Sequence, residues 1–199
     1  MSRLFCRFDL PARPAELDEG TALMCANHRS LFDLILAYIL LGSWGVPTRF
    51  LVNGKYFDTF GLGWLLRVTG CIPVESGRGD DAIDEGIAIL ADQGSVAIMP
   101  EGRLIPADER HDGVGPIRMG VGRLAVACPV PVMVVGVAGT DRVWPRSGVP
   151  RPRLRRPTVA VRVRVLSDLP GAADDARDAI VDTMTDLVAE AEAAAASPR

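Results

Sequence analysis

The chain has 199 residues, a length typical of one globular domain with a sizeable hydrophobic core. Hydrophobic residues make up 48% of it and charged residues 24%, which excludes disordered, collagenous and mainly coiled-coil proteins. The formal net charge is −3, so the overall charge gives no reason to expect a nucleic acid partner.

The first half of the chain alternates short apolar runs with stretches of helical periodicity. An apolar run that ends in polar residues favours a buried strand, and a serine just before a periodic stretch favours a helix N-cap, which we place at Ser30. In chain order, the predicted elements are a strand over 21–27, a helix over 31–41, a strand over 49–52, a helical segment over 57–67 and a strand over 70–75.

The second half continues the alternation. Acidic residues fill the first turns of a periodic stretch and Gly94 follows it, as expected for a helix. Valines at every second position near the C-terminus predict a half-exposed strand. The predicted elements are a helix over 80–91, a strand over 95–99, a helix over 116–128, strands over 131–137 and 159–165, and a helix over 172–196.

Strands that alternate with helices predict an α/β fold, with a mostly parallel central sheet flanked by helices. We expect a single domain over 1–199, with its motif-bearing core over about 20–140, completed by a strand and a helix in 157–196. The longest apolar run, 34–41, is far shorter than the ~20 residues that cross a bilayer. The first residues carry charges where a secretion signal needs an apolar stretch, so we expect a cytoplasmic protein.

Cysteine and histidine are sparse. The four cysteines, Cys6, Cys25, Cys71 and Cys128, form no C-x-x-C pair, and there are two histidines. This spacing favours neither a zinc site nor a disulfide framework. We expect buried free thiols in a reducing compartment, no metal and no cofactor.

A histidine follows the first predicted strand. His28 lies in the turn before the first predicted helix, and Asp33 follows in the first helical turn. From there a carboxylate can reach back to the imidazole, fix its tautomer and strengthen the other ring nitrogen as a general base. The alternative is structural, because Ser30 and Asp33 have nearly the spacing of a capping box.

A second polar turn follows the strand over 95–99. Glu101, Gly102 and Arg103 come directly after this strand, and a guanidinium beside a flexible glycine can bind phosphate oxygens. The alternative is an exposed Glu–Arg pair in a turn, which contributes little to stability.

The usual motifs of covalent catalysis and nucleotide binding do not occur. There is no G-x-S-x-G, no cysteine with a histidine nearby in sequence, no G-x-x-x-x-G-K-[ST] and no G-x-G-x-x-G. A general base without a covalent partner suits the activation of a substrate hydroxyl for direct acyl transfer.

Four blocks together resemble the glycerolipid acyltransferase family, which includes the lysophosphatidate acyltransferases. Residues 27–33 (N-H-R-S-L-F-D) are similar to the family's N-H-x-x-x-x-D, and residues 99–103 (M-P-E-G-R) to its F-P-E-G-T-R. Residues 70–75 (G-C-I-P-V-E) resemble G-x-x-F-[IV]-[DE]-R, and residues 130–135 (V-P-V-M-V-V) resemble V-P-[IV]-x-P-V. The blocks occur in the family's order and cover about residues 20–140.

The resemblance implies a role for each block. His28 would deprotonate an acceptor hydroxyl, which attacks the thioester of acyl-CoA or acyl-carrier protein, and Asp33 would orient the imidazole. Backbone N–H groups near the helix start would stabilise the tetrahedral oxyanion. The residues expected to contact a lysophospholipid acceptor are Glu101, Gly102 and Arg103, with Glu75 and Arg78 from the second block.

The phosphate-handling blocks depart from the family pattern. Ser76 replaces the arginine of the second block, with Arg78 two residues later, and Arg103 follows Gly102 without the intervening threonine. Val134 stands where the fourth block has a proline. The leading expectation is 1-acyl-sn-glycerol 3-phosphate as acceptor and phosphatidate as product. The alternatives are another lysolipid or a glycolipid acceptor, or a non-catalytic lipid-binding protein.

An arginine-rich stretch predicts peripheral contact with the anionic inner face of the cell membrane. Its centre, the expected docking site, is Arg151, Arg153, Arg155 and Arg156, and the whole run contains arginines 142, 146, 151, 153, 155, 156, 162 and 164. The alternative is a solvated basic loop that is balanced by the acidic residues of the last helix.

Apolar residues concentrate between the first two blocks. Some of the residues in 34–41 and 57–66, with Trp44, could line an acyl groove or enter a membrane interface. For most of them we expect the alternative, which is burial in the core.

Overall fold

Seven strands form one sheet within the residues that the computed structural model describes, which are 6–17, 20–146, 148 and 156–197. The strands are β1 (Arg7–Asp9), β2 (Leu23–Ala26), β3 (Thr48–Asn53), β4 (Ile72–Val74), β5 (Ser95–Ile98), β6 (Val132–Ala138) and β7 (Thr158–Leu166).

The order of the strands in the sheet is β1-β7-β6-β2-β5-β3-β4. All neighbouring strands run parallel except β6 and β7, which are antiparallel. Parallel neighbours need long crossover connections, which helices supply. The predicted α/β fold with a mostly parallel sheet is therefore confirmed.

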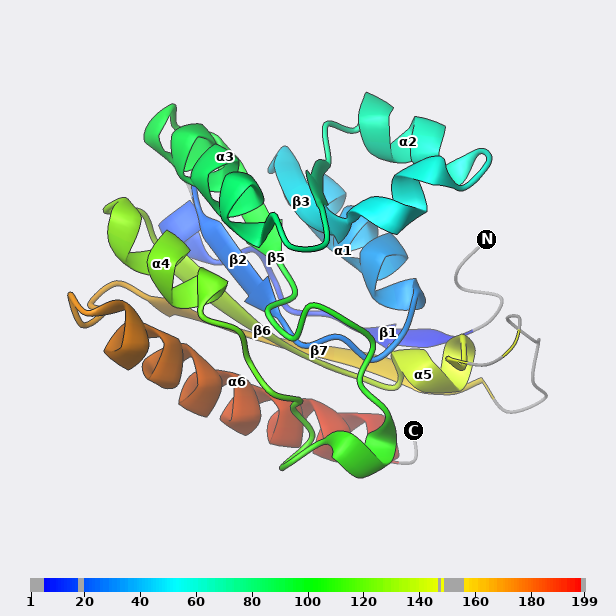
Figure 1. Ribbon diagram of the computed structural model, residues 1–199. Coiled ribbons are helices and arrows are strands. Elements are labelled where there is room, and N and C mark those ends of the chain that lie inside the picture. The colour runs from blue at the N-terminus through cyan, green and yellow to red at the C-terminus, as the bar shows by residue number, and fades with distance from the viewer. Residues whose placement is uncertain (1–5, 18–19, 147, 149–155, 198–199) are drawn as a thin grey trace.

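Helices cover both faces of this sheet (Figure 1). α1 (Phe32–Trp44) packs on one face, whereas α3 (Gly79–Ala91), α4 (Gly120–Ala127) and α6 (Ala173–Ala196) pack on the other. The shorter segments are η2 (Ala15–Leu17), η3 (Gly54–Asp58), α2 (Leu62–Val68), η4 (Ala107–Glu109) and α5 (Thr140–Val143).

The core is divided by the sheet, because consecutive strand side chains point to opposite faces. On β2, Met24 packs with the buried residues of α1, while Leu23 and Cys25 pack with those of α3, α4 and α6. Gly136 in β6 allows α6 to pack closely, since a Cβ at this position would lie 2.4 Å from the backbone carbon of Leu187. The central strands, which carry the candidate site, are thus buried on both faces.

Two predicted helices are shorter than expected. The segment predicted over 57–67 is divided into η3 and α2, and between them Gly61 has a φ of +75°, which interrupts a helix. The helix predicted over 116–128 begins only at Gly120. The N–H of Arg118 donates instead to the carbonyl of Pro100 (3.0 Å), which holds the preceding residues against the turn after β5.

The short elements β1, η2, η4 and α5 were not predicted, because no apolar run or helical periodicity marks them in the sequence. All four cysteines are buried thiols. Over the described ranges, no helix combines the length and the apolar character that a membrane crossing requires.

Candidate active site

The carboxyl ends of two adjacent parallel strands bring the candidate residues together. His28 follows β2 and Glu101 follows β5, and these strands pair in the middle of the sheet. In parallel α/β sheets this edge is where ligands bind. The side chain of Asn27 fixes the end of β2, because its amide donates to the carbonyl of Val137 (3.0 Å) and accepts from the N–H of Val137 (2.7 Å).

A hydrogen bond joins the side chains of His28 and Asp33, with 3.0 Å between Nδ1 and Oδ2. The imidazole is 18% exposed and the carboxylate 2%, so the imidazole is accessible while its partner is buried. When Asp33 is ionised and the imidazole is neutral, the carboxylate only accepts, so Nδ1 is the donor of this bond and the lone pair lies on Nε2. An imidazole in this state can accept a proton from a substrate hydroxyl.

The same oxygen of Asp33 organises the start of α1. It accepts from the N–H groups of Arg29 (2.7 Å) and Ser30 (2.8 Å). The helix begins at Phe32, so Ser30 is not the N-cap that we predicted. Its hydroxyl instead accepts from the N–H of Phe32 (3.0 Å) and donates to the carbonyl of Trp144 (2.7 Å). The structural interpretation of Asp33 therefore applies, and the same oxygen makes the hydrogen bond to His28 that an orienting role would require.

Most backbone donors at this helix start are already used. The groups engaged in hydrogen bonds within the protein are the N–H groups of His28, Arg29, Ser30, Phe32 and Asp33. The expectation that N–H groups here would stabilise an oxyanion is therefore wrong for these five groups, because each one faces an internal acceptor.

Glu101 is buried and is tied to the histidine turn. Its Oε2 accepts from the N–H of His28 (3.1 Å), and its Oε1 accepts from the N–H of Gly115 (3.0 Å). Burial raises the pKa of Glu101 above its ordinary value, against the opposing effect of these two hydrogen bonds. Both carboxylate oxygens are thus occupied by backbone donors, and the geometry gives Glu101 the task of holding the backbone at His28.

Gly102 and Arg103 lie at the surface beside this buried carboxylate. Gly102 has a φ of +69°, a conformation that favours glycine. The Arg103 guanidinium pairs with Glu109 of η4, so it does not form the surface pair with Glu101 that was the structural alternative.

The second block is more exposed. Arg78 precedes α3 and pairs with Asp81 (2.6 Å), with 74% of its side chain exposed. Glu75 is exposed and its carboxylate lies against Gly54, where a Cβ would be 2.4 Å from Oε1. Within the described chain, neither residue forms a hydrogen bond or an ion pair with His28, Asp33 or Glu101.

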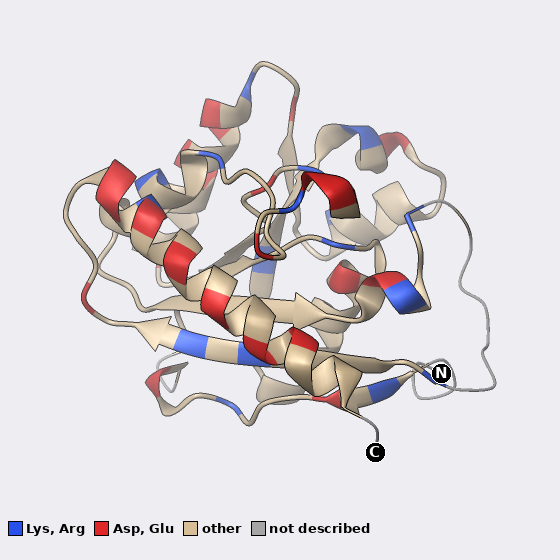
Figure 2. Ribbon diagram, turned by 90° about the horizontal axis from the view of Figure 1, so that it is seen from below, with Lys and Arg blue, Asp and Glu red and all other residues tan. Residues whose placement is uncertain are grey.

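Part of the arginine-rich stretch lies outside the described residues, namely Arg151, Arg153 and Arg155. Arg156 is described and exposed. On β7, Arg162 pairs with Asp9 (2.9 Å), and Arg164 pairs with Asp186 (3.6 Å) and Glu190 (3.3 Å) of α6. Figure 2 shows the acidic residues of α6 running beside these basic positions. The alternative of charge balance by the last helix thus holds for Arg164.

The apolar residues between the first two blocks divide into two groups. Most are core, as expected: Leu36, Leu40, Leu41, Trp44, Phe57 and Leu66 are buried, and Leu34, Ala37, Tyr38 and Leu62 are partly buried against them. On and next to α2, however, Phe60 is 103% exposed, Trp64 69% and Val68 65%. Trp64 and Val68 lie four residues apart on α2 and form an exposed apolar strip, and Phe60 lies in the turn just before the helix.

No sequence pattern indicated that Arg29 is a buried cation at the site. Arg29 donates through Nη2 to the carbonyl of Gly113 (2.9 Å) and to Glu192 Oε1 of α6 (2.6 Å). These partners are 84 and 163 residues away, so no local pattern indicates them. The sequence could have indicated the role of Asn27, because this polar residue ends an apolar strand in the first block.

Comparison with known proteins identifies the family and the fold. The sequence profile of the acyltransferase family matches residues 10–138. The crystal structure of the 1-acyl-sn-glycerophosphate (LPA) acyltransferase PlsC from Thermotoga maritima superposes with a TM-score of 0.79, at 19% identity, over 96% of this chain and 75% of that one. No curated protein matches the sequence significantly. At this low identity the structural likeness establishes the fold.

Proposed function

The chain belongs to the acyltransferase family, and from this premise we propose that it transfers a fatty acyl group from a thioester to the hydroxyl of a lysophospholipid. The first acceptor that we propose is 1-acyl-sn-glycerol 3-phosphate, which gives phosphatidate. The donor is acyl-CoA or acyl-carrier protein. The observation that carries the proposal is the 3.0 Å contact between His28 Nδ1 and Asp33 Oδ2 at the carboxyl edge of the sheet.

In the proposed mechanism, His28 is the general base. Its Nε2 accepts the proton of the acceptor hydroxyl as the oxygen attacks the thioester carbonyl. Asp33 holds Nδ1–H and stabilises the imidazolium that forms. The tetrahedral intermediate then collapses, the C–S bond breaks, and the imidazolium returns its proton to the leaving thiolate. No covalent acyl-enzyme intermediate is required.

Acceptor binding is assigned to the surface around the second and third blocks. Gly102 and Arg103 contact the acceptor phosphate, with Arg78 and Glu75 at its edge. Arg103 is half-exposed and its only partner in the described chain is the exposed Glu109, so a phosphate can displace that carboxylate. Glu101 stabilises this turn from its buried side, because its carboxylate oxygens accept hydrogen bonds from backbone N–H groups.

We also propose peripheral contact with an anionic membrane at the inner face of the cell membrane. Arg151, Arg153, Arg155 and Arg156 supply positive charge, at about 1 kcal/mol for each residue near an anionic surface. The exposed apolar residues Phe60, Trp64 and Val68, on and just before α2, supply an apolar contact.

The departure of the second block, Ser76 in place of arginine, favours a second candidate acceptor, another lysolipid or a glycolipid. A non-catalytic lipid-binding protein is the weaker alternative, because such a protein has no need of an imidazole oriented by a carboxylate.

The decisive experiment incubates the purified protein with radiolabelled acyl-CoA or acyl-carrier protein and a panel of lysolipids and glycolipids. We expect an acylated lysophospholipid from the wild-type protein and a loss of at least ~100-fold in kcat for His28→Ala. The matched control is His111→Ala, in an exposed turn, which should retain activity. Transfer by folded His28→Ala at the wild-type rate would disprove the mechanism, and no transfer to any acceptor would disprove the function.

A further inference from the structure

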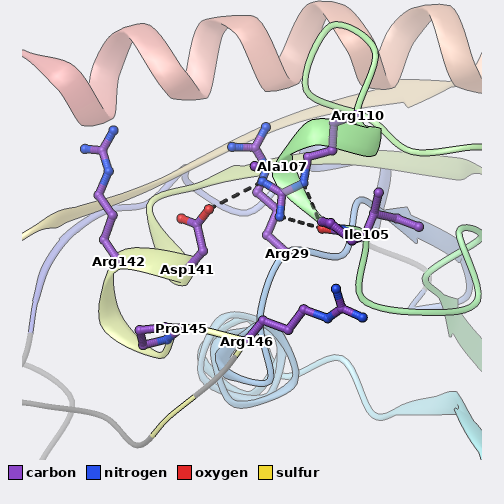
Figure 3. A pocket seen from close by; sticks show the side chains of 9 residues that line it. Arg29, Ile105, Ala107, Arg110, Asp141, Arg142, Pro145 and Arg146 are labelled. Atoms are coloured by element: carbon purple, nitrogen blue, oxygen red, sulfur yellow. Dashed lines mark hydrogen bonds and ion pairs between the residues drawn. The ribbon is translucent and has the colours of Figure 1, made fainter.

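A pocket of about 380 Å³ lies beside the candidate active site and is lined by four arginines. They are Arg29, just before α1, Arg110, just after η4, Arg142 in α5, and Arg146 beyond it. Figure 3 shows the four side chains around this pocket, with Asp141 as the acidic residue among them. The lining thus brings four guanidinium groups together with one carboxylate.

The positive charge of this pocket is only partly compensated. Arg110 uses Nε and Nη2 on the carbonyl of Ile105 (3.1 and 2.8 Å) and meets Asp141 at 3.4 Å. Arg142 and Arg146 are exposed. Within the part of the chain that the structure describes, neither forms a hydrogen bond or an ion pair. Arg29 is paired with Glu192 (2.6 Å), so the uncompensated charges of the lining are those of Arg142 and Arg146, and a bound anion lowers the free energy of these like charges.

A buried donor in the same lining also lacks an acceptor. Arg29 is 6% exposed, and although Nη2 is satisfied, Nε is buried without a hydrogen-bond partner in the described residues. Leaving a buried charged donor without an acceptor is costly. This Nε is closed to solvent, so a ligand in the pocket meets the exposed guanidinium groups of the lining, and phosphate accepts from several such groups at once.

The pocket is continuous with the turn that carries the proposed base. Arg29 follows His28 directly, and the Ser30 hydroxyl donates to the carbonyl of Trp144 (2.7 Å), which ties the start of α1 to the end of α5. The lining contains none of the residues His28, Glu101 and Arg103, so the pocket is separate from the surface assigned above to the acceptor phosphate.

We infer that this pocket binds a phosphate group of a substrate of the transfer reaction. The inference rests on the proposed function and adds a phosphate subsite to it. Its volume is near the lower end of the roughly 300–1,000 Å³ of small-molecule sites, which suits a phosphate with a short attached segment. Two sources share this chemistry. One is the phosphates of the acyl donor, and the other is the phosphate of the acceptor, for which the pocket would take the place of the surface at Gly102 and Arg103.

The test measures binding by isothermal titration calorimetry, without turnover, for the wild type and the double variant Arg142→Ala, Arg146→Ala. Separate titrations use CoA, sn-glycerol 3-phosphate and inorganic phosphate. We expect Kd to rise about tenfold or more for CoA or for glycerol 3-phosphate, because charge-assisted contacts are lost. The ligand whose Kd rises identifies whether the acyl donor or the acceptor supplies the phosphate. Both side chains are exposed and lack recorded partners, so the thermal unfolding midpoint should not change.

The matched control is Arg123→Ala on α4, whose guanidinium pairs with Asp80 and Asp84 far from this lining. Its Kd values should equal those of the wild type. Equal weakening by the control and the double variant, no weakening by the double variant, or no binding by the wild type would each overturn the phosphate subsite.

Acyl transfer is assayed separately, so that the two proposals can fail independently. A subsite for one substrate raises the KM of that substrate in the double variant and changes kcat less. Normal transfer with unaltered KM values would overturn the subsite and leave the proposed function intact. Pocket-dependent phosphate binding without any acyl transfer would instead count against the proposed function.

Discussion

A single carboxylate oxygen connects the candidate base, His28, to the start of α1. Oδ2 of Asp33 receives three donors, His28 Nδ1 and the N–H groups of Arg29 and Ser30. Oδ1 is buried without a hydrogen-bond partner in the described part of the chain. The orientation of the imidazole and the shape of the turn therefore depend on the same atom, and any change to this atom affects both.

Replacing this carboxylate by an amide tests its importance. In Asp33→Asn one oxygen can still accept, but the amide NH2 occupies the buried position of Oδ1 and the negative charge beside the imidazole is lost. We expect kcat to fall by roughly 100-fold or more, and the free energy of unfolding to fall by about 1–3 kcal/mol. Steady-state kinetics and urea denaturation measure the two effects.

Asp80→Asn is the matched control for this change, because Asp80 is also an acid in a first helical turn but is exposed on α3. It should leave kcat unchanged. A folded Asp33→Asn protein with the kcat of the wild type would remove the orienting role from Asp33.

At the scale of elements, α2 and the residues before it present an apolar face that the fold does not cover. Phe60, Trp64 and Val68 lie at intervals of four residues and are largely exposed, although the buried Leu66 anchors the same helix. An exposed apolar face of this kind marks an interaction site, and tryptophan is favoured at membrane interfaces. The element therefore suits contact with the surface that holds a lipid acceptor.

Vesicle sedimentation tests this face. We expect the partition of Phe60→Gln, Trp64→Gln onto vesicles with anionic lipid to be at least about tenfold weaker than that of the wild type, because each buried large apolar side chain contributes roughly 1.5–3 kcal/mol. Binding should also weaken as salt rises, since arginine contacts are screened.

Val126→Gln is the control, since Val126 is an exposed apolar residue on α4. Vesicle binding that is the same for the α2 double variant and the wild type would exclude this face from the membrane contact. Vesicle binding that depends on neither anionic lipid nor salt would exclude the arginine stretch from the membrane contact.

At the scale of the whole molecule, Glu101 links the central strands to the loop that covers them. One oxygen holds the backbone after β2 and the other holds Gly115, while the carboxylate itself follows β5. Burial raises the pKa of Glu101 above its ordinary value, so this link contributes to the pH dependence of global stability.

The sign of that dependence follows from proton binding. Between the ordinary value of 4.5 and the raised value, the folded protein binds more protons at Glu101 than the unfolded chain does. The free energy of unfolding of the wild type, relative to Glu101→Gln, should therefore increase as pH falls through the raised pKa and level off below 4.5. Urea denaturation of both proteins at a series of pH values measures this difference, since the other carboxyl groups are common to both. A flat difference, or one that falls toward acid pH, would refute the expectation.

Local patterns in the sequence were sufficient for six of the seven strands of the described sheet, β2 to β7, for the main helices and for the pairing of His28 with Asp33. These two residues are five positions apart across one turn, so the chain itself limits where their side chains can meet. The alternation of apolar residues likewise determines which strand and helix faces are buried, because it depends only on backbone periodicity.

Only the tertiary structure decided which distant residues complete the site. Glu101 reaches the His28 backbone across 73 positions, and Arg29 reaches Glu192 across 163. These contacts depend on strand order and on the packing of α6 against the sheet, which no local spacing encodes. The arginine-lined pocket arises in the same way, because three separate segments contribute its charges and become neighbours only when the sheet assembles.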